Sequence, residues 1–327
     1  MQSVITSHGI KLSYQDRGDK AAPVIILIMG LGAQMTVWPD ELYFGLVDKG
    51  FRVIRFDNRD VGQSSQLDEF GDPSLVKSWL STRFPSRLKV PYLLEDMAGD
   101  VLALMSSLKI KKAHLVGASM GGMIGQIIAA QHKKRVLSLT SIMSSSSSPK
   151  ISSTNMSVFL KLAKRPQPSA REAVIQYHMK MNRLIGSPKY PAKEQELRAQ
   201  AKKNIERGYN PGGFKRQLAA ITASGDRRKL AQKIKVPTLV IHGSADPVIP
   251  LSAGIETAKH IPKTKLKVVY GLGHDFPVPL MPKLAKWITK HALKSQEKSQ
   301  KRAQEKSQEK LQKKALQKAK KKQAQAN

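Results

Sequence analysis

A short strand pattern that runs without a break into a helix is the feature that most restricts how this chain can fold. Residues 112–117 read KAHLVG, and residues 121–132 read GGMIGQIIAAQH, which is a helical pattern rich in small residues. In such a sharp strand-to-helix turn, the residue two positions before the central residue and the residue two positions after it lie very close together. Both must therefore be small. Gly117 and Gly121 meet this need, and the pattern predicts that Ser119 stands on a strained turn.

The rest of the chain alternates between short apolar runs and helical patterns. The run VIILIMG at 24–30 and the run FRVIRFD at 51–57 are typical of buried parallel strands. Helical patterns follow at 38–50 and 92–110. KLSYQDRG (11–18), with its alternating pattern, is read as a parallel strand as well. Further strands are predicted by VLSLTSIM (136–143), VPTLVIHGSADPVIP (236–250) and KLKVVYGLGHDFP (265–277). This alternation predicts an α/β fold with a mostly parallel sheet that helices cover on both faces.

The alternation stops between about residues 146 and 232, where helical segments separated by Pro and Gly replace the strands. This stretch is predicted to be a helical insertion. The predicted organisation is therefore a first part of the core at 1–145, the insertion at 146–232, a second part of the core at 233–293 and a basic low-complexity tail at 294–327.

The chain is strongly basic, with 56 Lys and Arg against 24 Asp and Glu and a formal net charge of +32. Residues 291–327 hold 12 Lys and Arg against 3 Glu, so they carry +9 and leave +23 for residues 1–290. In the tail a four-residue rhythm runs from Lys298 to Lys322. High intrinsic propensity favours a nascent helix there, but like charges at this spacing oppose helix formation by a few tenths of a kcal/mol per pair. Without an apolar stripe the helix buries nothing, so we expect a solvated, frayed tail. Its charge fits either a nonspecific anionic partner or a solubilising appendage.

A serine hydroxyl is a poor nucleophile unless a base removes its proton. Two later strand ends offer partners for Ser119, namely Asp246 in HGSADPVIP and His274 in GLGHDFP. The order Ser, Asp, His is the one that sheets with such a turn use. We expect His274 to act as the base and Asp246 to orient its ring. The backbone N–H groups of Met120 and of Leu31, in the loop after the strand at 24–30, are the predicted donors to an oxyanion.

Other candidates for these roles are weaker. Asp275 directly follows His274 and precedes a helix, so a role as a cap or loop anchor explains it better than the role of the acid. A phosphate-binding loop at Ser119 would need the lysine of a Walker motif, which is missing. A dinucleotide fingerprint in GLGAQM fails because Met35 stands where the third glycine is required.

Together these segments make the chain resemble the α/β-hydrolase fold serine hydrolases, and the DNRDVGQS stretch resembles the branch that includes the aclacinomycin methylesterase and many bacterial carboxylesterases. The resemblance covers roughly residues 1–293. It implies that the insertion at 146–232 is a helical cap and that Asp57 and Arg59 brace the loop beside the site. The chain departs from many relatives at Met29, where they carry histidine, and in its lysine-rich tail.

Serine at the turn disfavours the relatives that use aspartate there, the haloalkane dehalogenases and epoxide hydrolases. The sequence therefore predicts a carboxylic ester hydrolase that acts on a small-molecule ester through an acyl-serine intermediate, without metal or cofactor. Thioesterase, lactonase, carbon–carbon hydrolase and cofactor-free perhydrolase activities use the same triad and stay open. So does a role from another class, a basic binding protein that retains the hydrolase fold.

The absence of cysteine excludes disulfides and thiolate metal sites. The start of the chain shows no secretory pattern. The longest apolar run, at 24–29, is too short to span a bilayer. A cytoplasmic protein without an integral membrane segment is the expectation. Neither the oligomeric state nor the physiological ester can be predicted.

Overall fold

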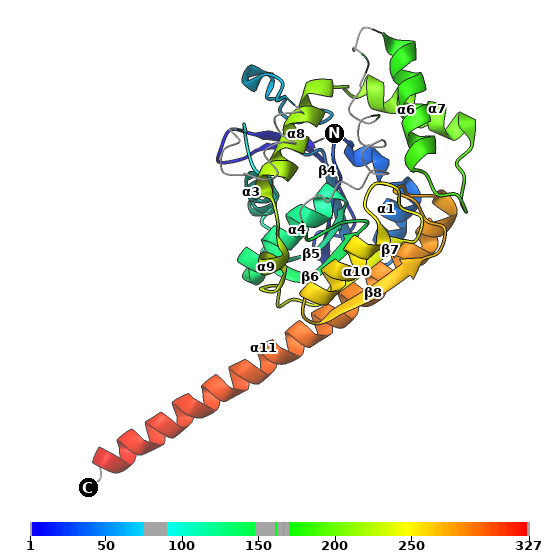
Figure 1. Ribbon diagram of the computed structural model, residues 1–327. Coiled ribbons are helices and arrows are strands. Elements are labelled where there is room, and N and C mark those ends of the chain that lie inside the picture. Colours follow the sequence, from blue (N-terminus) through cyan, green and yellow to red (C-terminus); the bar gives the residue numbers. More distant parts are fainter. Residues whose placement is uncertain (1, 75–89, 148–160, 162–165, 167–169, 326–327) are drawn as a thin grey trace.

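The computed structural model describes residues 2–74, 90–147, 161, 166 and 170–325. Its centre is an eight-stranded sheet with the order β1-β2-β4-β3-β5-β6-β7-β8 (Figure 1). The strands are β1 (Gln2–Ile5), β2 (Lys11–Arg17), β3 (Val24–Ile28), β4 (Arg52–Phe56), β5 (Ala113–Ala118), β6 (Val136–Ile142), β7 (Thr238–Gly243) and β8 (Thr264–Val269). The predicted mostly parallel sheet is confirmed.

The first two strands depart from the prediction. Strands β3 to β8 pair in parallel, whereas β1 pairs with β2, and β2 with β4, in antiparallel fashion. The reading of residues 11–18 as a parallel strand is therefore wrong. The chain passes from β2 to β3 through only six residues, Gly18 to Pro23, which are too few to carry it back along the length of the sheet, so β3 and its parallel neighbour β4 run opposite to β2. Strand β1 escaped prediction because its four residues are largely exposed and show no apolar run.

Helices cover both faces of the sheet. The α-helices of the described part of the chain are α1 (Asp40–Val47), α3 (Leu94–Ser107), α4 (Met120–Gln131), α6 (Arg171–Ile185), α7 (Glu194–Glu206), α8 (Pro211–Ser224), α9 (Arg228–Ala231), α10 (Leu251–His260) and α11 (Met281–Gln325). Ile26 and Ile28 of β3 pack into the apolar cluster that includes α3 and α4, while Ile25 and Leu27 pack into the cluster that includes α1 and α11. Successive side chains of a strand point to opposite faces, so β3 supplies both apolar layers.

The described residues between β6 and β7 contain helices α6 to α9 and no strand. Helices α6 and α7 pack against each other through a small apolar cluster of their own, which contains Met179, Leu197 and Ala201. This agrees with a helical insertion. Its boundaries at 146 and 232 stay a prediction because part of residues 148–169 lies outside the described residues.

The tail is helical, as its intrinsic propensity favours, because α11 continues without a break to Gln325 and leaves the body of the molecule (Figure 1). Fraying of this helix stays a prediction. The first turns of α11 pack on the sheet through Leu284 and Ile288. Nucleation is the costly step of helix formation, and this packed start supplies the nucleus. The Ala, Lys, Glu and Gln residues beyond it then only propagate the helix. No helix in the described part of the chain is apolar over enough of its length to cross a membrane.

Candidate active site

Ser119 stands between β5 and α4 in a strained conformation, with φ of +53° and ψ of −119°. The backbone around it is too crowded for larger residues. A Cβ atom at Gly117 would lie 2.2 Å from the carbonyl oxygen of Gly121, and one at Gly121 would lie 2.0 Å from that of Ile28. The two glycines thus allow the chain to reverse at this point, and they place Ser119 at the carboxyl edge of the sheet.

Ser119, His274 and Asp246 come together from the ends of β5, β8 and β7. The Ser119 Oγ atom lies 3.0 Å from His274 Nε2, and His274 Nδ1 lies 2.7 Å from Asp246 Oδ2. The second carboxylate oxygen, Oδ1, accepts hydrogen bonds from the backbone N–H groups of Val248 and Ile249, each at 2.9 Å. The buried carboxylate is therefore held in one orientation. With the proton of neutral His274 on Nδ1, its Nε2 is free to accept the hydroxyl proton of Ser119.

The alternative acid, Asp275, lies in a different set of contacts. Its carboxylate accepts hydrogen bonds from the Ser187 hydroxyl and from the Ser187 N–H, the latter at 3.2 Å. Burial raises the pKa of Asp275, while the hydrogen bonds from Ser187 oppose that shift. The Ser187 hydroxyl in turn accepts from the N–H of Gly273 at 2.8 Å. Asp275 thus anchors the loop after α6 to the loop that carries His274.

Two other histidines, His114 of β5 and His242 of β7, are held by hydrogen bonds. His242 Nε2 lies 2.8 Å from the carbonyl oxygen of Ile249, and His114 Nδ1 lies 2.8 Å from Ser138 Oγ. Burial lowers the pKa of both rings, that of His114 to about 4. They are therefore neutral at pH 7. Among the residues that the structure describes, no cluster of three or more His, Asp or Glu side chains is arranged to hold a metal ion.

The loop after β3, which carries the predicted oxyanion donor Leu31, passes directly beside Ser119. A Cβ atom at Gly30 would lie 3.0 Å from Ser119 Cβ. On the other side of Ser119, Met120 is the first residue of α4, where the N-terminal end of the helix favours negative charge. The amides of Leu31 and Met120 thus flank the serine, and their role as oxyanion donors stays a prediction.

Two glutamines that the sequence analysis did not single out hold this loop. Gln217 of α8 is fully buried; its Oε1 accepts from the N–H of Gly32 at 2.7 Å, and its Nε2 donates to the carbonyl oxygen of Arg59 at 2.7 Å. Gln34 Nε2 donates to the carbonyl oxygens of Asn204 and Gly208, at 2.6 and 2.7 Å. The insertion between β6 and β7 therefore fixes the loop beside Ser119. In the sequence, a polar residue at a buried position of the α8 pattern is the one feature that could have indicated this contact.

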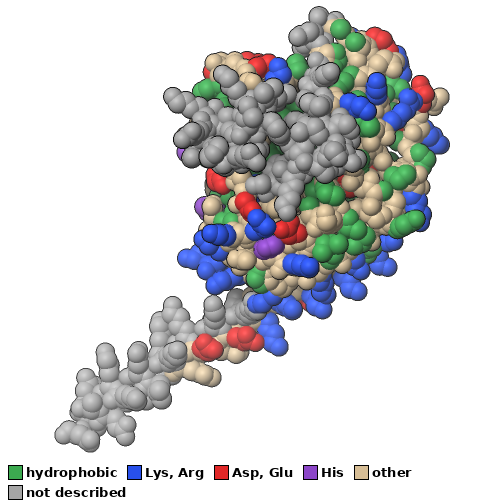
Figure 2. All heavy atoms as spheres, in the orientation of Figure 1, with side chains coloured by type: hydrophobic (Ala, Val, Ile, Leu, Met, Phe, Trp, Pro, Cys, Tyr) green, Lys and Arg blue, Asp and Glu red, His purple; other side chains and the backbone are tan. Residues whose placement is uncertain are grey.

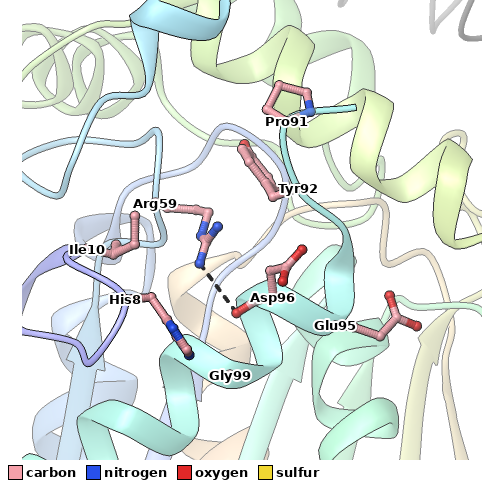
Figure 3. Close-up of a pocket in the computed structure, with 8 residues that line it drawn as sticks. All are labelled: His8, Ile10, Arg59, Pro91, Tyr92, Glu95, Asp96 and Gly99. Atoms are coloured by element: carbon pink, nitrogen blue, oxygen red, sulfur yellow. Dashed lines mark hydrogen bonds between the residues drawn. The ribbon is translucent and has the colours of Figure 1, made fainter. Parts of the chain in front are cut away.

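Asp57 and Arg59 have separate sets of partners. Asp57 accepts from the N–H of Met35 and from Arg207 Nη2, both at 2.7 Å, and so braces the loop after β3. The Arg59 side chain points away, to Asp100 of α3, with nitrogen–oxygen distances of 2.6 and 2.7 Å. Arg59 also lines a cavity of about 420 Å³ near the start of α3 (Figure 3). This cavity is not lined by Ser119, Asp246 or His274.

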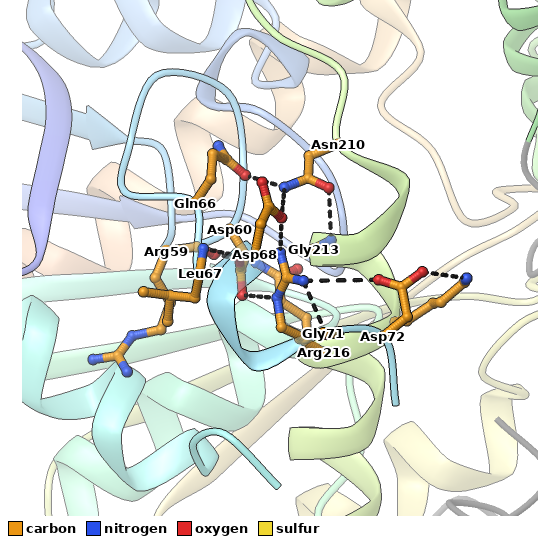
Figure 4. Close-up of polar contacts among 12 residues, drawn as sticks. Arg59, Asp60, Gln66, Leu67, Asp68, Gly71, Asp72, Asn210, Gly213 and Arg216 are labelled. Carbon is orange, nitrogen blue, oxygen red and sulfur yellow. Dashed lines mark hydrogen bonds and ion pairs between the residues drawn. The ribbon is translucent and has the colours of Figure 1, made fainter. Parts of the chain in front are cut away.

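Arg216 anchors α8 to the loop after β4 (Figure 4). Its side chain is 1% exposed and makes two hydrogen bonds to the buried carboxylate of Asp60, at 3.0 and 2.7 Å. It also donates to Asp68 at 2.6 Å and to the carbonyl oxygen of Gly71 at 3.1 Å. Because the bidentate geometry is specific, Arg216 sets where α8, and with it Gln217, meets the core.

Comparisons with known proteins identify the family of this fold. Rhodomycin D methylesterase of Streptomyces peucetius is 26% identical over 88% of this chain and 97% of the relative. 3-Oxoadipate enol-lactonase 1 of Acinetobacter baylyi is 26% identical over 81% of this chain and 87% of the relative. The crystal structure of the enol-lactonase from Burkholderia xenovorans superposes with a TM-score of 0.66 at 25% identity, covering 88% of this chain and 97% of that one. Residues 23–278 match the family described as alpha/beta hydrolase fold, and the chain belongs to that family.

Proposed function

We propose that the protein is a serine hydrolase that cleaves carboxylic esters and that Ser119, His274 and Asp246 form its catalytic triad. The observation that supports this most is the continuous set of contacts from Ser119 Oγ through the His274 ring to Asp246, at 3.0 and 2.7 Å. A nucleophile, a base and a group that orients the base are the parts that acyl transfer requires. The relatives named as a methylesterase and as enol-lactonases act on the same class of bond.

In the proposed reaction, His274 Nε2 takes the hydroxyl proton as Ser119 Oγ attacks the ester carbonyl carbon. The N–H groups of Leu31 and Met120 stabilise the negative carbonyl oxygen. His274 then gives the proton to the leaving alkoxide, so the alcohol departs and an acyl-serine remains. A water molecule, deprotonated by His274, attacks this ester in the same way and releases the carboxylic acid. Asp246 keeps the ring oriented and stabilises the imidazolium throughout.

The helical insertion at 146–232 is proposed to be a cap that shapes the site for a small-molecule ester. Its described residues reach both the loop after β3 and the loop that carries His274. Gln217 holds the loop after β3 through Gly32, and Ser187 holds the loop of His274 through Asp275. Such contacts allow the cap to set the geometry of the catalytic groups as well as the choice of substrate.

Lactone hydrolysis is the second candidate activity, and the similarity to two enol-lactonases favours it. A lactone is a cyclic ester, so the same steps apply, except that the leaving alkoxide stays attached to the acyl group. A substrate panel of short to medium p-nitrophenyl esters and of five- and six-membered lactones separates the two activities.

Intact-mass spectrometry after exposure to a fluorophosphonate tests the proposal. We expect one adduct on the wild-type protein and on Ser106→Ala, a matched change at an exposed serine of α3, and none on Ser119→Ala. On the preferred ester, kcat should fall by roughly 10⁵-fold or more in Ser119→Ala. Full activity of Ser119→Ala, or an adduct at another residue, would refute the assignment.

A further inference from the structure

The sheet edge opposite Ser119 is lined with lysine. Ser119, Asp246 and His274 follow the carboxyl ends of their strands, whereas the segments that lead into β5, β6, β7 and β8 meet at the other edge, because these strands run in parallel. All four leading segments carry exposed lysines. They are Lys109, Lys111, Lys112, Lys133, Lys134, Lys233, Lys235 and Lys263.

The same surface continues onto β8 and the start of α11. Exposed lysines there are Lys265 and Lys267 of β8 and Lys283, Lys286, Lys290 and Lys294 of α11. Lys and Arg side chains gather on the body near the point where α11 leaves it (Figure 2). We call these lysines of the leading segments, β8 and the start of α11 the basic face. Its lysines lie within the stretches 101–147, 227–245, 257–274 and 276–296, and these stretches contain no Asp or Glu.

A purely structural reason accounts for only part of this charge. Lysines on an edge strand prevent pairing with another chain, which explains Lys265 and Lys267, because β8 is an edge of the sheet. Strands β5 and β6 lie inside the sheet, so the lysines that precede them cannot serve to protect an edge strand from pairing. Those four, Lys111, Lys112, Lys133 and Lys134, repel one another at neighbouring strand ends, where Ala113 pairs with Val136. Such repulsion is relieved when an anionic partner binds.

We propose that the basic face binds the phosphate backbone of duplex nucleic acid without sequence specificity, and that α11 extends this contact. A duplex presents one charge per about 1.7 Å, and lysine binds phosphate as a point charge. From Lys294 to Gln325, α11 extends about 48 Å at 1.5 Å per residue. A helix that lies in a membrane interface needs an apolar face, and beyond Lys294 the only large apolar residues are Leu311 and Leu316. Duplex nucleic acid therefore fits better than a bilayer surface.

Fluorescence anisotropy with a labelled 20-base-pair DNA duplex, measured between 50 and 200 mM KCl, tests the proposal. The test variant carries Lys111→Gln, Lys112→Gln, Lys133→Gln and Lys134→Gln. The control variant carries the same number of changes on exposed lysines of the helical insertion, which lies on the far side of the molecule (Figure 1). These are Lys180→Gln, Lys193→Gln, Lys202→Gln and Lys203→Gln. Both variants have the same net charge.

For the wild-type protein and the control, affinity should fall roughly 10³-fold across this salt range, as for six or more phosphate contacts. The test variant should bind more weakly at every salt concentration, and its salt slope should be smaller by up to about one unit for each lysine removed. Hydrolysis of a small ester should continue when the duplex saturates the protein, because Ser119 lies at the opposite edge.

Three results would overturn the proposal. Equal weakening of test and control variants would mean that net charge alone is responsible. Binding to vesicles with 30% phosphatidylserine but not to the duplex would assign the face to membranes. Loss of ester hydrolysis on saturation with the duplex would place the contact near Ser119 instead. Binding is measured without turnover. The comparison of the two variants and the vesicle measurement therefore test the proposal even if the protein does not hydrolyse esters.

Discussion

The substitution Gln217→Met tests whether the helical insertion positions the loop beside Ser119. Methionine fills nearly the same volume as glutamine but neither donates nor accepts at the two positions where Gln217 does. In the wild-type protein these bonds, both 2.7 Å long, reach the N–H of Gly32 and the carbonyl oxygen of Arg59. The variant therefore leaves the buried carbonyl oxygen of Arg59 and the partly buried N–H of Gly32 without this partner, and Gly32 is next to the proposed oxyanion donor Leu31.

The magnitude follows from these contacts. A buried polar group left without a partner costs about 1–3 kcal/mol. The free energy of unfolding should therefore fall by about that much for the Arg59 carbonyl, and by less for the partly buried N–H of Gly32. Loss of one oxyanion donor lowers kcat by about 10²–10³-fold. Gln217 only positions such a donor, so a smaller decrease in kcat, on the order of 10-fold to 10²-fold, is expected, with little change in KM.

The assay compares kcat and KM on the preferred p-nitrophenyl ester with unfolding in urea. Thr222→Val is the control on the same helix, because the buried Thr222 hydroxyl donates only within α8, to the carbonyl oxygen of Leu218 at 3.0 Å. This variant should lose stability but keep kcat. Gln217→Glu, which retains an acceptor for Gly32, should recover part of kcat. If Gln217→Met unfolds more easily and yet keeps kcat within twofold, Gln217 is structural only and the reasoning is refuted.

Three further changes test the structure elsewhere. Burial lowers the pKa of His114 from 6.5 to about 4. Between these two pH values the His114 ring is protonated in the unfolded chain but neutral in the folded protein. The free energy of unfolding should therefore fall by about 3 kcal/mol between pH 7 and pH 4. In His114→Gln, urea unfolding should show that much less pH dependence. Arg216→Met leaves the Asp60 carboxylate buried and unpaired and should cost about 3–5 kcal/mol in urea unfolding, part of which Arg216→Met with Asp60→Asn should recover. Gly121→Ala would place its Cβ 2.0 Å from the Ile28 carbonyl oxygen and should abolish fluorophosphonate labelling, whereas Gly99→Ala, with open space around it in α3, should raise stability by up to about 1 kcal/mol.

The fold and the meeting of Ser119, Asp246 and His274 could be predicted because the sequence patterns that indicate them are local. Gly117 and Gly121 stand beside Ser119 in the sequence, and Asp246 and His274 each follow an apolar strand pattern. The carboxyl ends of parallel strands meet at one edge of a sheet, so the strand pattern alone brings these residues together. Strand direction at 11–17 was missed because an alternating strand looks the same in either orientation.

The contacts that hold the site could not be predicted in this way. Gln217 is 185 residues from Gly32, and Arg216 is 156 from Asp60. Nothing next to either residue in the sequence indicates its partner. In the sequence, a glutamine or arginine that is buried in a helix resembles a solvated one until the helix is placed against its neighbour. The anchoring of the insertion therefore depends on tertiary packing that periodicity does not encode.

The distribution of charge lies between these two cases. The tail carries a charge of +9 and the rest of the chain +23, so most of the charge lies outside the tail. The lysines of 109–112 and 133–134 directly precede predicted parallel strands, and segments that lead into parallel strands share the edge opposite the catalytic groups. The strand rule that gathers Ser119, Asp246 and His274 at one edge thus gathers these lysines at the other. If both edges are functional, changes on the basic face should alter duplex binding and leave kcat unchanged, and Ser119→Ala should do the reverse.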